Sequence, residues 1–503
     1  MKRNKITLLL AAFLLVCGCS DFEEINVNPN NPPTVPANLL LPTVISTAVS
    51  SMTGSGNGAA GQFIQHINYI GGSNESFGRF NITGASFREE WNAPMRSVKD
   101  INQILDIAEK NNQPQYKALG LICKVYVLSL MTDAYGDIPY NEAGKGDVSG
   151  LEFPHYQEQK EVYRLMLADL ETANQLLKAD ATISDDILFN GDAVKWRKYA
   201  NSLKVRILMR QSAKKDVSAD IAAIFNNAQE YPVFTSIDDQ ATLVYNNTVD
   251  FYKWYIQPKN LPSDGSGVIF GDNFRVSEAI VDALQTKDDP RLPVYVAPTK
   301  HSFEAHRANA SVPFVYRGQP AGLSAAEQNE IDKDDYSVLS STIRSESRAF
   351  VMTFAELQFL KAEAIIRGMI TGNAADEYAK GIRASMQKWA AISSDDVDVY
   401  LARPDVALNT AQNEALKQIG TQAWIDSFLN GFEAFANWRR TGYPELKVGT
   451  SVSSAIPVRY IYSDNEQNNP NLISWTNEKI GRMVNETDMV WFQPQKWNTN
   501  VNR

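Results

Sequence analysis

Apolar residues recur at helical spacing along most of the chain, and the segments that show this spacing come in pairs. Within each segment, apolar positions lie three or four residues apart, as on one face of a helix. One pair is too small to bury its own apolar stripe, so the pairs are expected to stack on one another. The pattern predicts a mainly α-helical fold with four tetratricopeptide-like helix pairs, near residues 93–132, 158–214, 353–390 and 411–437.

Long insertions separate the helix pairs and have a different composition. They are rich in Gly, Asn, Pro and aromatic residues, and they contain only short strand-like runs such as 241–245 and 312–316. The insertions cover residues 54–90, 231–275, 290–350 and 443–503. Irregular segments on a rigid scaffold often carry binding sites, so we expect a ligand to bind there.

The start of the chain has the pattern of an export signal with a lipidation site. Three basic residues precede an apolar run over residues 6–16, which is too short to span a bilayer because a helix needs about 20 apolar residues. The run closes with a lipobox, Leu15-Val16-Cys17-Gly18-Cys19. Cleavage before Cys19 and acylation of its thiol would anchor the protein without a transmembrane helix. An ordinary secretory signal that contains a chance cysteine is the alternative.

Three parts follow from this pattern. Residues 1–18 are the predicted signal peptide, residues 19–38 are the lipidated Cys19 with an Asn- and Pro-rich tether, and residues 39–503 are one α-helical domain. The acidic stretch directly after Cys19 is similar to the tag that carries some lipoproteins to the outer face of the outer membrane. A merely solvated tether would have the same composition.

Charge and cysteine content narrow the possible partners. The formal charge is −10, and removal of the three basic residues of the signal peptide makes it −13. An acidic chain without a basic run is poorly suited to nucleic acid or anionic lipid headgroups.

With Cys17 cleaved away and Cys19 acylated, only Cys123 remains, so no intramolecular disulfide can form. Stability must come from a core, in which Cys123 is expected to be buried.

Several short motifs are spread along the chain, some within the predicted helices and some between them. They include Thr132-Asp133-Ala134-Tyr135-Gly136-Asp137-Ile138-Pro139-Tyr140, Asn190-Gly191-Asp192, Asp289-Pro290-Arg291-Leu292, Phe354-Ala355-Glu356-Leu357, Gly431-Phe432-Glu433 and Asn437-Trp438-Arg439-Arg440. In this order they resemble the SusD/RagB family of outer-membrane lipoproteins, particularly its second SusD-like branch, over about residues 21–497. Ser463, where the family has proline, and Val490-Trp491-Phe492, where it has paired tryptophans, depart from the family pattern.

The resemblance implies a surface-exposed, lipid-anchored, non-catalytic protein of the outer membrane. Members of the family capture oligosaccharides, or in some cases peptides, and deliver them to a SusC-type TonB-dependent transporter. Their fold has four tetratricopeptide-like helix pairs, in agreement with the periodicity, and no cofactor is implied. Three alternatives stay open: a peptide-binding member of the family, a surface glycan hydrolase, and a lid whose ligand is held by the transporter alone.

Two insertions contain the side chains that a sugar site needs. A sugar presents an apolar face ringed by hydroxyls, so it calls for an aromatic platform with hydrogen-bonding groups at the edge. Residues 66–80 and 246–260 both have this mixture, although such clusters also arise from loop packing. The candidate ligand-binding residues are Tyr69, Asn74, Phe77, Asn247, Asp250, Tyr252, Trp254 and Tyr255.

Other motif residues are expected to serve the fold. Asp133 and Asp137 should brace local backbone at a helix end, and Arg439 and Arg440 should form ion pairs. The tryptophans that lie within helical patterns are expected in the core, and they are Trp196, Trp389, Trp424 and Trp438.

Catalytic and metal signals are weak. Glu356 and Glu363 could be read as the paired carboxylates of a glycosidase, but both lie in a helix-packing motif. His301 and His306 would point about 140° apart on a helix, so they do not predict a zinc site. Loop carboxylates leave calcium open.

Overall fold

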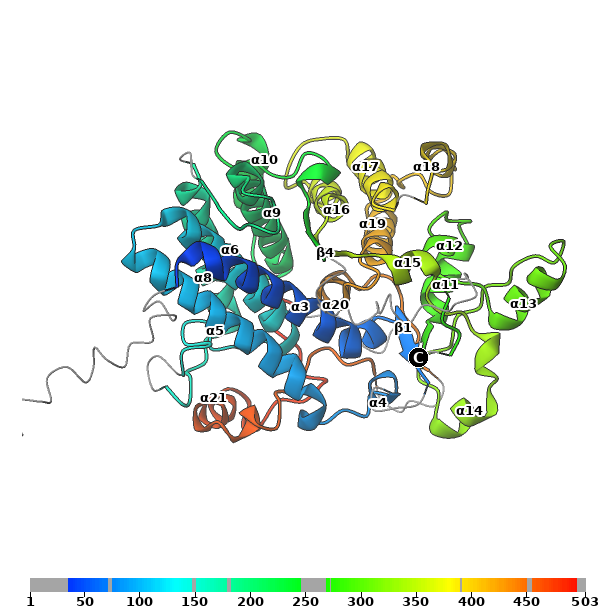
Figure 1. The fold of residues 1–503 in the computed structure, drawn as a ribbon, viewed down its shortest axis with the longest axis horizontal. Helices are drawn as coiled ribbons and strands as arrows, with labels where there is room; N and C mark the ends of the chain where they lie inside the picture. The colour runs from blue at the N-terminus through cyan, green and yellow to red at the C-terminus, as the bar shows by residue number, and fades with distance from the viewer. Residues whose placement is uncertain are drawn as a thin grey trace, which may run out of the picture.

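The computed structural model describes residues 35–70, 75–146, 151–178, 182–245, 268–271, 273–389, 391–449 and 455–494. The predicted signal peptide and Cys19 lie outside these residues. Four helix pairs form the scaffold, as the periodicity predicts, and the two helices of each pair are in contact (Figure 1). The pairs are α5 (Arg88–Lys110) with α6 (Pro114–Tyr135), α8 (Gln159–Leu176) with α9 (Ala193–Gln211), α16 (Phe354–Ile366) with α17 (Ala374–Gln387), and α19 (Gln412–Asp426) with α20 (Gly431–Thr441).

The helix that begins at Ala37 was not expected from the sequence. α3 (Ala37–Phe63) is the longest helix of the described chain and packs against α5, α6 and α20 at the centre of the molecule (Figure 1). It is rich in Ser, Thr and Gly and contains Pro42, all of which disfavour a helix. The sequence pattern therefore places its second half in the insertion at 54–90. Burial of residues such as Leu41 and Phe63 outweighs this weak propensity.

The insertions hold short helices and two small sheets. β1 (Ile67–Tyr69) pairs with β3 (Phe274–Val276), and β2 (Ala241–Val244) pairs with β4 (Arg348–Met352), both antiparallel. β2 confirms the strand-like run at 241–245, whereas the run at 312–316 is extended chain outside any strand. The short helices are α4 (Glu75–Gly78), α10 (Ser218–Asn226), α11 (Glu278–Gln285), α12 (Leu292–Tyr295), α13 (Lys300–Ala308), α14 (Ala325–Glu330), α15 (Ser341–Ser345), α18 (Ser394–Leu401) and α21 (Pro470–Ile480).

Buried charges join four helices of the scaffold. Arg206 on α9 pairs with Glu356 on α16, with Nε 2.6 Å from Oε1. Arg210, one turn further along α9, lies 2.6 Å from Glu433 on α20 and 3.0 Å from Asp133 on α6. All five side chains are buried, and we call them the buried charge network.

Arg439 completes the charge balance of this network. Its guanidinium donates to the carbonyl oxygens of Asp133 (2.6 Å) and Val458 (3.1 Å) and lies 3.8 Å from the ring centre of Phe435. The expected ion pair of Arg439 is thus replaced by carbonyl and ring contacts, whereas Arg440 pairs with Glu363 at 2.6 Å, as predicted.

The most apolar scaffold helix belongs to the core. Among the described residues, α6 is the helix that is long and apolar enough to cross a bilayer, but 94% of its apolar window is buried inside the protein. The helical tryptophans are also in the core, as predicted, and they are Trp196, Trp389, Trp424 and Trp438.

Cys123, on α6, is expected to be unreactive in the folded protein. Its side chain is buried, and this burial raises the pKa of the thiol to about 12. Because the thiolate is the reactive form, a thiol reagent at neutral pH should label the mature chain only after denaturation. Rapid labelling of Cys123 in the native protein would contradict this placement.

Candidate ligand-binding site

The segment that contains Tyr69 forms a short strand just after α3. In the β1–β3 pair, Ile67 faces Val276, Asn68 faces Arg275 and Tyr69 faces Phe274. Asn68 Nδ2 also donates to the carbonyl oxygen of Gln319 at 2.9 Å. Tyr69 is therefore held on a strand that is fixed by its backbone and by a neighbouring side chain.

The two flanks of segment 246–267 attach at different places, and the second attaches directly after this strand. Before the segment, Tyr245 N donates to Ser347 O at 2.9 Å, in the turn between α15 and β4. After it, Asn273 O accepts a hydrogen bond from Ile70 N at 2.5 Å. The chain that follows segment 246–267 therefore adjoins the segment of Tyr69, and we call the region around β1 and β3 the β1–β3 site.

Arg344, on α15, adds a positive charge to the β1–β3 site. Its side chain is buried, and this burial lowers the pKa of the guanidinium to about 10, while its attraction to Tyr69 opposes the shift. Arg344 therefore stays protonated at neutral pH beside a half-buried phenol ring. A guanidinium offers several N–H donors, which suits hydroxyl or carboxylate oxygens of a ligand. Sequence reasoning missed Arg344 because it lies far along the chain from Tyr69.

Phe77, in the same insertion as Tyr69, lies in the core. It is 4% exposed, and its ring packs against Phe63, 6.4 Å away, and Phe87, 5.7 Å away. This position makes Phe77 part of the core packing and offers no open ring face to a ligand. The other candidate residues besides Tyr69 lie outside the described residues, and they are Asn74, Asn247, Asp250, Tyr252, Trp254 and Tyr255.

The carboxylates of the sequence motifs are engaged in structural contacts. Glu356 and Glu363 each pair with a buried arginine on another helix. Asp137 Oδ1 accepts from Gln159 N at 2.8 Å, so it braces backbone at the start of α8 and not the local amides that the sequence predicts. Asp133 accepts from Tyr163 and Arg210, so it braces side chains and not local amides.

A large cavity of about 690 Å³ lies between α11, α19 and residues 443–449. Charged pairs stand at its rim, with Lys287 3.1 Å from Asp405 and Lys417 3.3 Å from Glu445. The aromatic residues in its lining are almost fully buried, so the described wall offers no exposed ring on which a sugar could stack. They are Tyr378, Tyr400 and Trp424.

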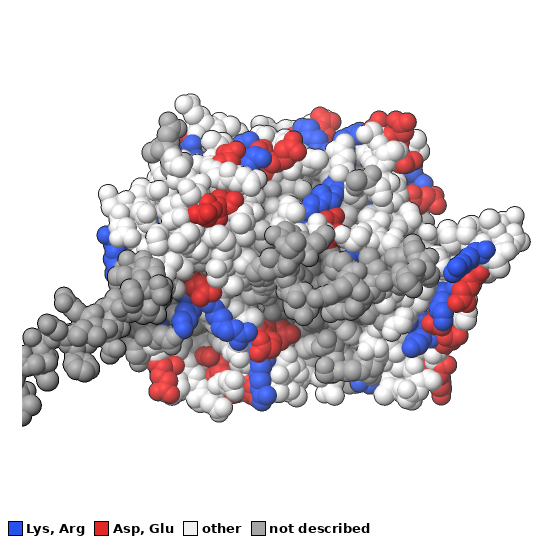
Figure 2. All heavy atoms as spheres, in the orientation of Figure 1, with Lys and Arg blue, Asp and Glu red and all other residues white. Residues whose placement is uncertain are grey.

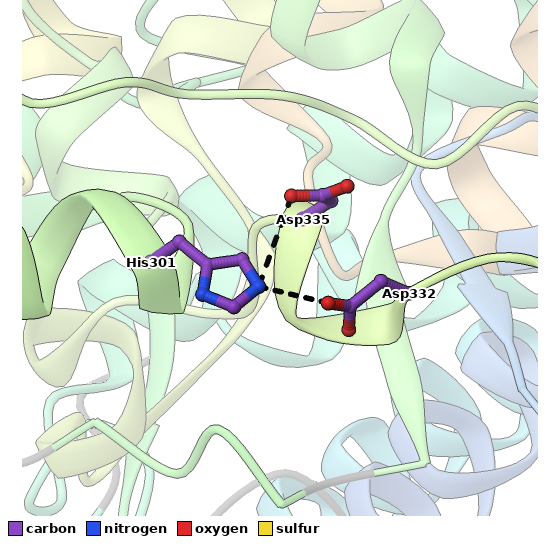
Figure 3. Close-up of side chains that lie close together, drawn as sticks. All are labelled: His301, Asp332 and Asp335. Atoms are coloured by element: carbon purple, nitrogen blue, oxygen red, sulfur yellow. Dashed lines mark hydrogen bonds and ion pairs between the residues drawn. The ribbon is translucent and has the colours of Figure 1, made fainter.

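An exposed cluster connects α13 with the 3₁₀ turn η4 (Lys333–Asp335), as Figure 3 shows. His301 Nε2 lies 2.8 Å from Asp332 Oδ2 and 3.9 Å from Asp335 Oδ1. These atoms lie close enough for a metal ion, but an ion pair with a protonated imidazole accounts for the geometry. His306 points elsewhere, with Nδ1 2.6 Å from Val312 O.

The contact between α13 and η4 is expected to weaken as the pH rises. The hydrogen bond to Asp332 raises the pKa of His301 above its usual 6.5. The stabilisation is then fully present below pH 6.5 and is lost as the pH passes the raised pKa of the folded protein. NMR titration of the imidazole should show the raised pKa, and Asp332→Asn should lower it. An unchanged pKa in that variant would contradict the contact.

Comparison with known proteins identifies the family. A SusD-like family model, described as "Starch-binding associating with outer membrane", matches residues 29–463. The chain belongs to this SusD-like family. No curated protein shows a significant match.

Solved structures confirm the SusD-like fold. A candidate outer-membrane nutrient-binding protein from Bacteroides vulgatus is 25% identical, with a TM-score of 0.78 over 91% of this chain and 100% of that one. A chitin-binding protein is 26% identical, with a TM-score of 0.73 over 91% and 99%. A SusD homologue from Bacteroides fragilis is 23% identical, with a TM-score of 0.76 over 91% and 100%, and shows the same fold.

In this SusD-like protein, β1 lies on the side of the molecule that carries α11–α14, away from the helix pair α8–α9 (Figure 1). Positive and negative side chains are interspersed over the described part of the face in Figure 2. Recognition on such a surface depends on local contacts and not on a broad field of one sign.

Proposed function

We propose that this SusD-like protein is a surface-exposed, non-catalytic lipoprotein that captures oligosaccharides and passes them to a SusC-type TonB-dependent transporter. The family match over residues 29–463 carries this proposal, because its description names both starch binding and the outer membrane. The similarity to a chitin-binding protein at 26% identity supports a carbohydrate as the ligand.

The β1–β3 site is the ligand site of this proposal. Tyr69 would stack on a sugar ring, and the charge of the buried Arg344 would act on this site from within the protein. The chain that follows segment 246–267 pairs with Ile70, directly after β1, which supports a common site for Tyr69 and the aromatic residues of that segment. The further proposed contacts are Asn74, Asn247, Asp250, Tyr252, Trp254 and Tyr255.

Calorimetry with the purified mature chain tests the ligand class. Maltoheptaose and chitohexaose represent the starch and chitin chemistries, a peptide mixture represents the peptide alternative, and the same samples are analysed for cleavage. We expect saturable sugar binding without cleavage, weakened about tenfold or more by Tyr69→Ala. Cleavage that one Glu or Asp substitution abolishes would favour a hydrolase. Binding of peptides alone would favour the peptide-binding alternative.

Membrane attachment depends on Cys19 in this proposal. Cys19→Ala removes the acylated thiol, so the protein is expected to leave the outer-membrane fraction. Cys17→Ala is the matched control, because it leaves the lipidated residue in place. Protein that stays in the outer-membrane fraction in Cys19→Ala would contradict the lipid anchor. Co-purification of the anchored protein with a TonB-dependent transporter tests the partner.

A further inference from the structure

A second cavity lies at the C-terminal end of the described chain, away from the β1–β3 site. It has a volume of about 480 Å³, within the range of about 300–1,000 Å³ typical of ligand pockets. The turn after α6, the start of α8, α21 and residues 484–491 surround it. We call it the α21 cavity, and the lining residues that matter here are Asp137, Glu158, Lys160, Trp475, Lys479 and Trp491.

Two half-buried tryptophans line the α21 cavity, and each is held by a fixed partner. Trp475 Nε1 donates to Asp137 Oδ2 at 2.8 Å, which sets the orientation of the indole. Trp491 packs against the ring of Tyr163, with ring centres 6.0 Å apart. Preorganised aromatic rings lose little conformational entropy on binding, so they suit the apolar face of a sugar.

The charged residues of the cavity balance one another. Glu158 lies 2.7 Å from Lys160 Nζ and also pairs with Lys479. Arg459 adds a further positive charge, and Asp137 and Asp488 add two negative ones, which gives three of each sign. A cavity without net charge favours an uncharged ligand, and Glu158 and Lys160 offer hydrogen-bonding groups at its edge.

Lys479 lies over the indole ring of Trp475, on which a sugar would stack. Its Nζ is 4.9 Å from the ring centre of Trp475, and its side chain is 38% exposed. An exposed lysine has many accessible rotamers, and Glu158 gives it a second partner when it leaves the ring. A ligand can therefore replace the ammonium over Trp475 without breaking a buried contact.

We propose that the α21 cavity is a second binding site for a neutral oligosaccharide, distinct from the β1–β3 site. The two indoles would stack on sugar rings, while Glu158 and Lys160 would bond the hydroxyls at their edge. Exposed Ile480 and Met489 would extend the apolar surface at the mouth of the cavity. The choice of ligand rests on the carbohydrate class proposed above, but the site itself does not depend on the β1–β3 site.

Calorimetry in the Tyr69→Ala background tests this site, with maltoheptaose and chitohexaose as probes. Sugar binding that remains in Tyr69→Ala is expected to weaken about tenfold or more when Trp475→Ala is added. Ile473→Ala is the matched control, since Ile473 is an exposed apolar residue of α21 outside the cavity lining, and it should leave this binding unchanged. Trp475→Phe preserves most of the packing if Trp475→Ala folds poorly, and it should weaken binding severalfold.

The outcomes separate the two proposals. Sugar binding that Tyr69→Ala reduces, and that neither Trp475 variant changes, would overturn the α21 site and leave the proposed function standing. Binding that Tyr69→Ala leaves at full strength and that Trp475→Ala alone abolishes would support the α21 site and remove the β1–β3 site from its assigned role. If neither sugar binds the wild-type chain, both proposals fail.

Discussion

Glu433→Gln is expected to lower the free energy of unfolding by about 3–5 kcal/mol, because it removes one partner from a buried set of charges. Glu433 lies 2.6 Å from Arg210 and 3.4 Å from Arg206, both almost fully buried. Burial raises the pKa of Glu433, but the attraction of the two arginines is stronger and holds this pKa below the usual 4.5. Urea denaturation of the wild type and the variant measures the difference.

The pH dependence of this difference has a defined sign. A carboxylate with a lowered pKa in the folded protein stabilises it above pH 4.5 and loses this effect as the pH falls through the lowered value. The gap between the wild type and Glu433→Gln should therefore be widest near neutral pH and narrow in acid. A gap that widens in acid would contradict the assignment of Glu433 as the charged partner.

Glu377→Gln is the matched control for Glu433→Gln. Glu377, on α17, is also buried, but its partners Lys361 and Lys380, both 3.1 Å away, have 31% and 56% exposed side chains. These lysines can turn to water when the carboxylate is lost, so the cost should stay below about 1 kcal/mol. Equal losses in the two variants would show that burial of the arginines is not the cause.

The sequence predicts those parts of the fold in which apolar periodicity and burial agree. The four helix pairs are regular, and Asp192 caps α9, accepting from Lys195 N at 3.0 Å. The sequence does not predict α3, because its Ser, Thr and Gly residues have low helix propensity and tertiary packing stabilises the helix. α21 is not predicted for a related reason, since it is short and lies in a stretch rich in Asn and aromatic residues.

The sites are less predictable because they depend on contacts between distant segments. Composition draws attention to the loop of Tyr69, but only the fold brings Arg344 beside it. Phe77 has the right chemistry for a sugar platform, and its burial removes it from the surface. In the α21 cavity, Trp475 and Asp137 come from separate parts of the chain, and no local spacing indicates that they meet.

Gly318→Ala is expected to destabilise the protein by about 3 kcal/mol and to weaken sugar binding at the β1–β3 site. A Cβ at residue 318 would lie 2.3 Å from Glu278 Cα and 2.5 Å from Ser277 O, both backbone atoms at the start of α11 that cannot move aside locally. The chain at 317–319 must then shift away from β3. This shift strains the 2.9 Å hydrogen bonds from Glu278 N to Gln319 O and from Gln319 N to Val276 O.

The effect should reach Tyr69 through Gln319, because Asn68 Nδ2 also donates to Gln319 O and Asn68 precedes Tyr69 on β1. Gly271→Ala is the matched control in the same region, since a Cβ there would meet no atom within 4 Å, and it should leave stability and binding unchanged. Thermal denaturation and calorimetry with the sugar that binds the wild type measure both effects. If Gly318→Ala lost stability but kept full affinity, residues 317–319 would support the fold without positioning the β1–β3 site.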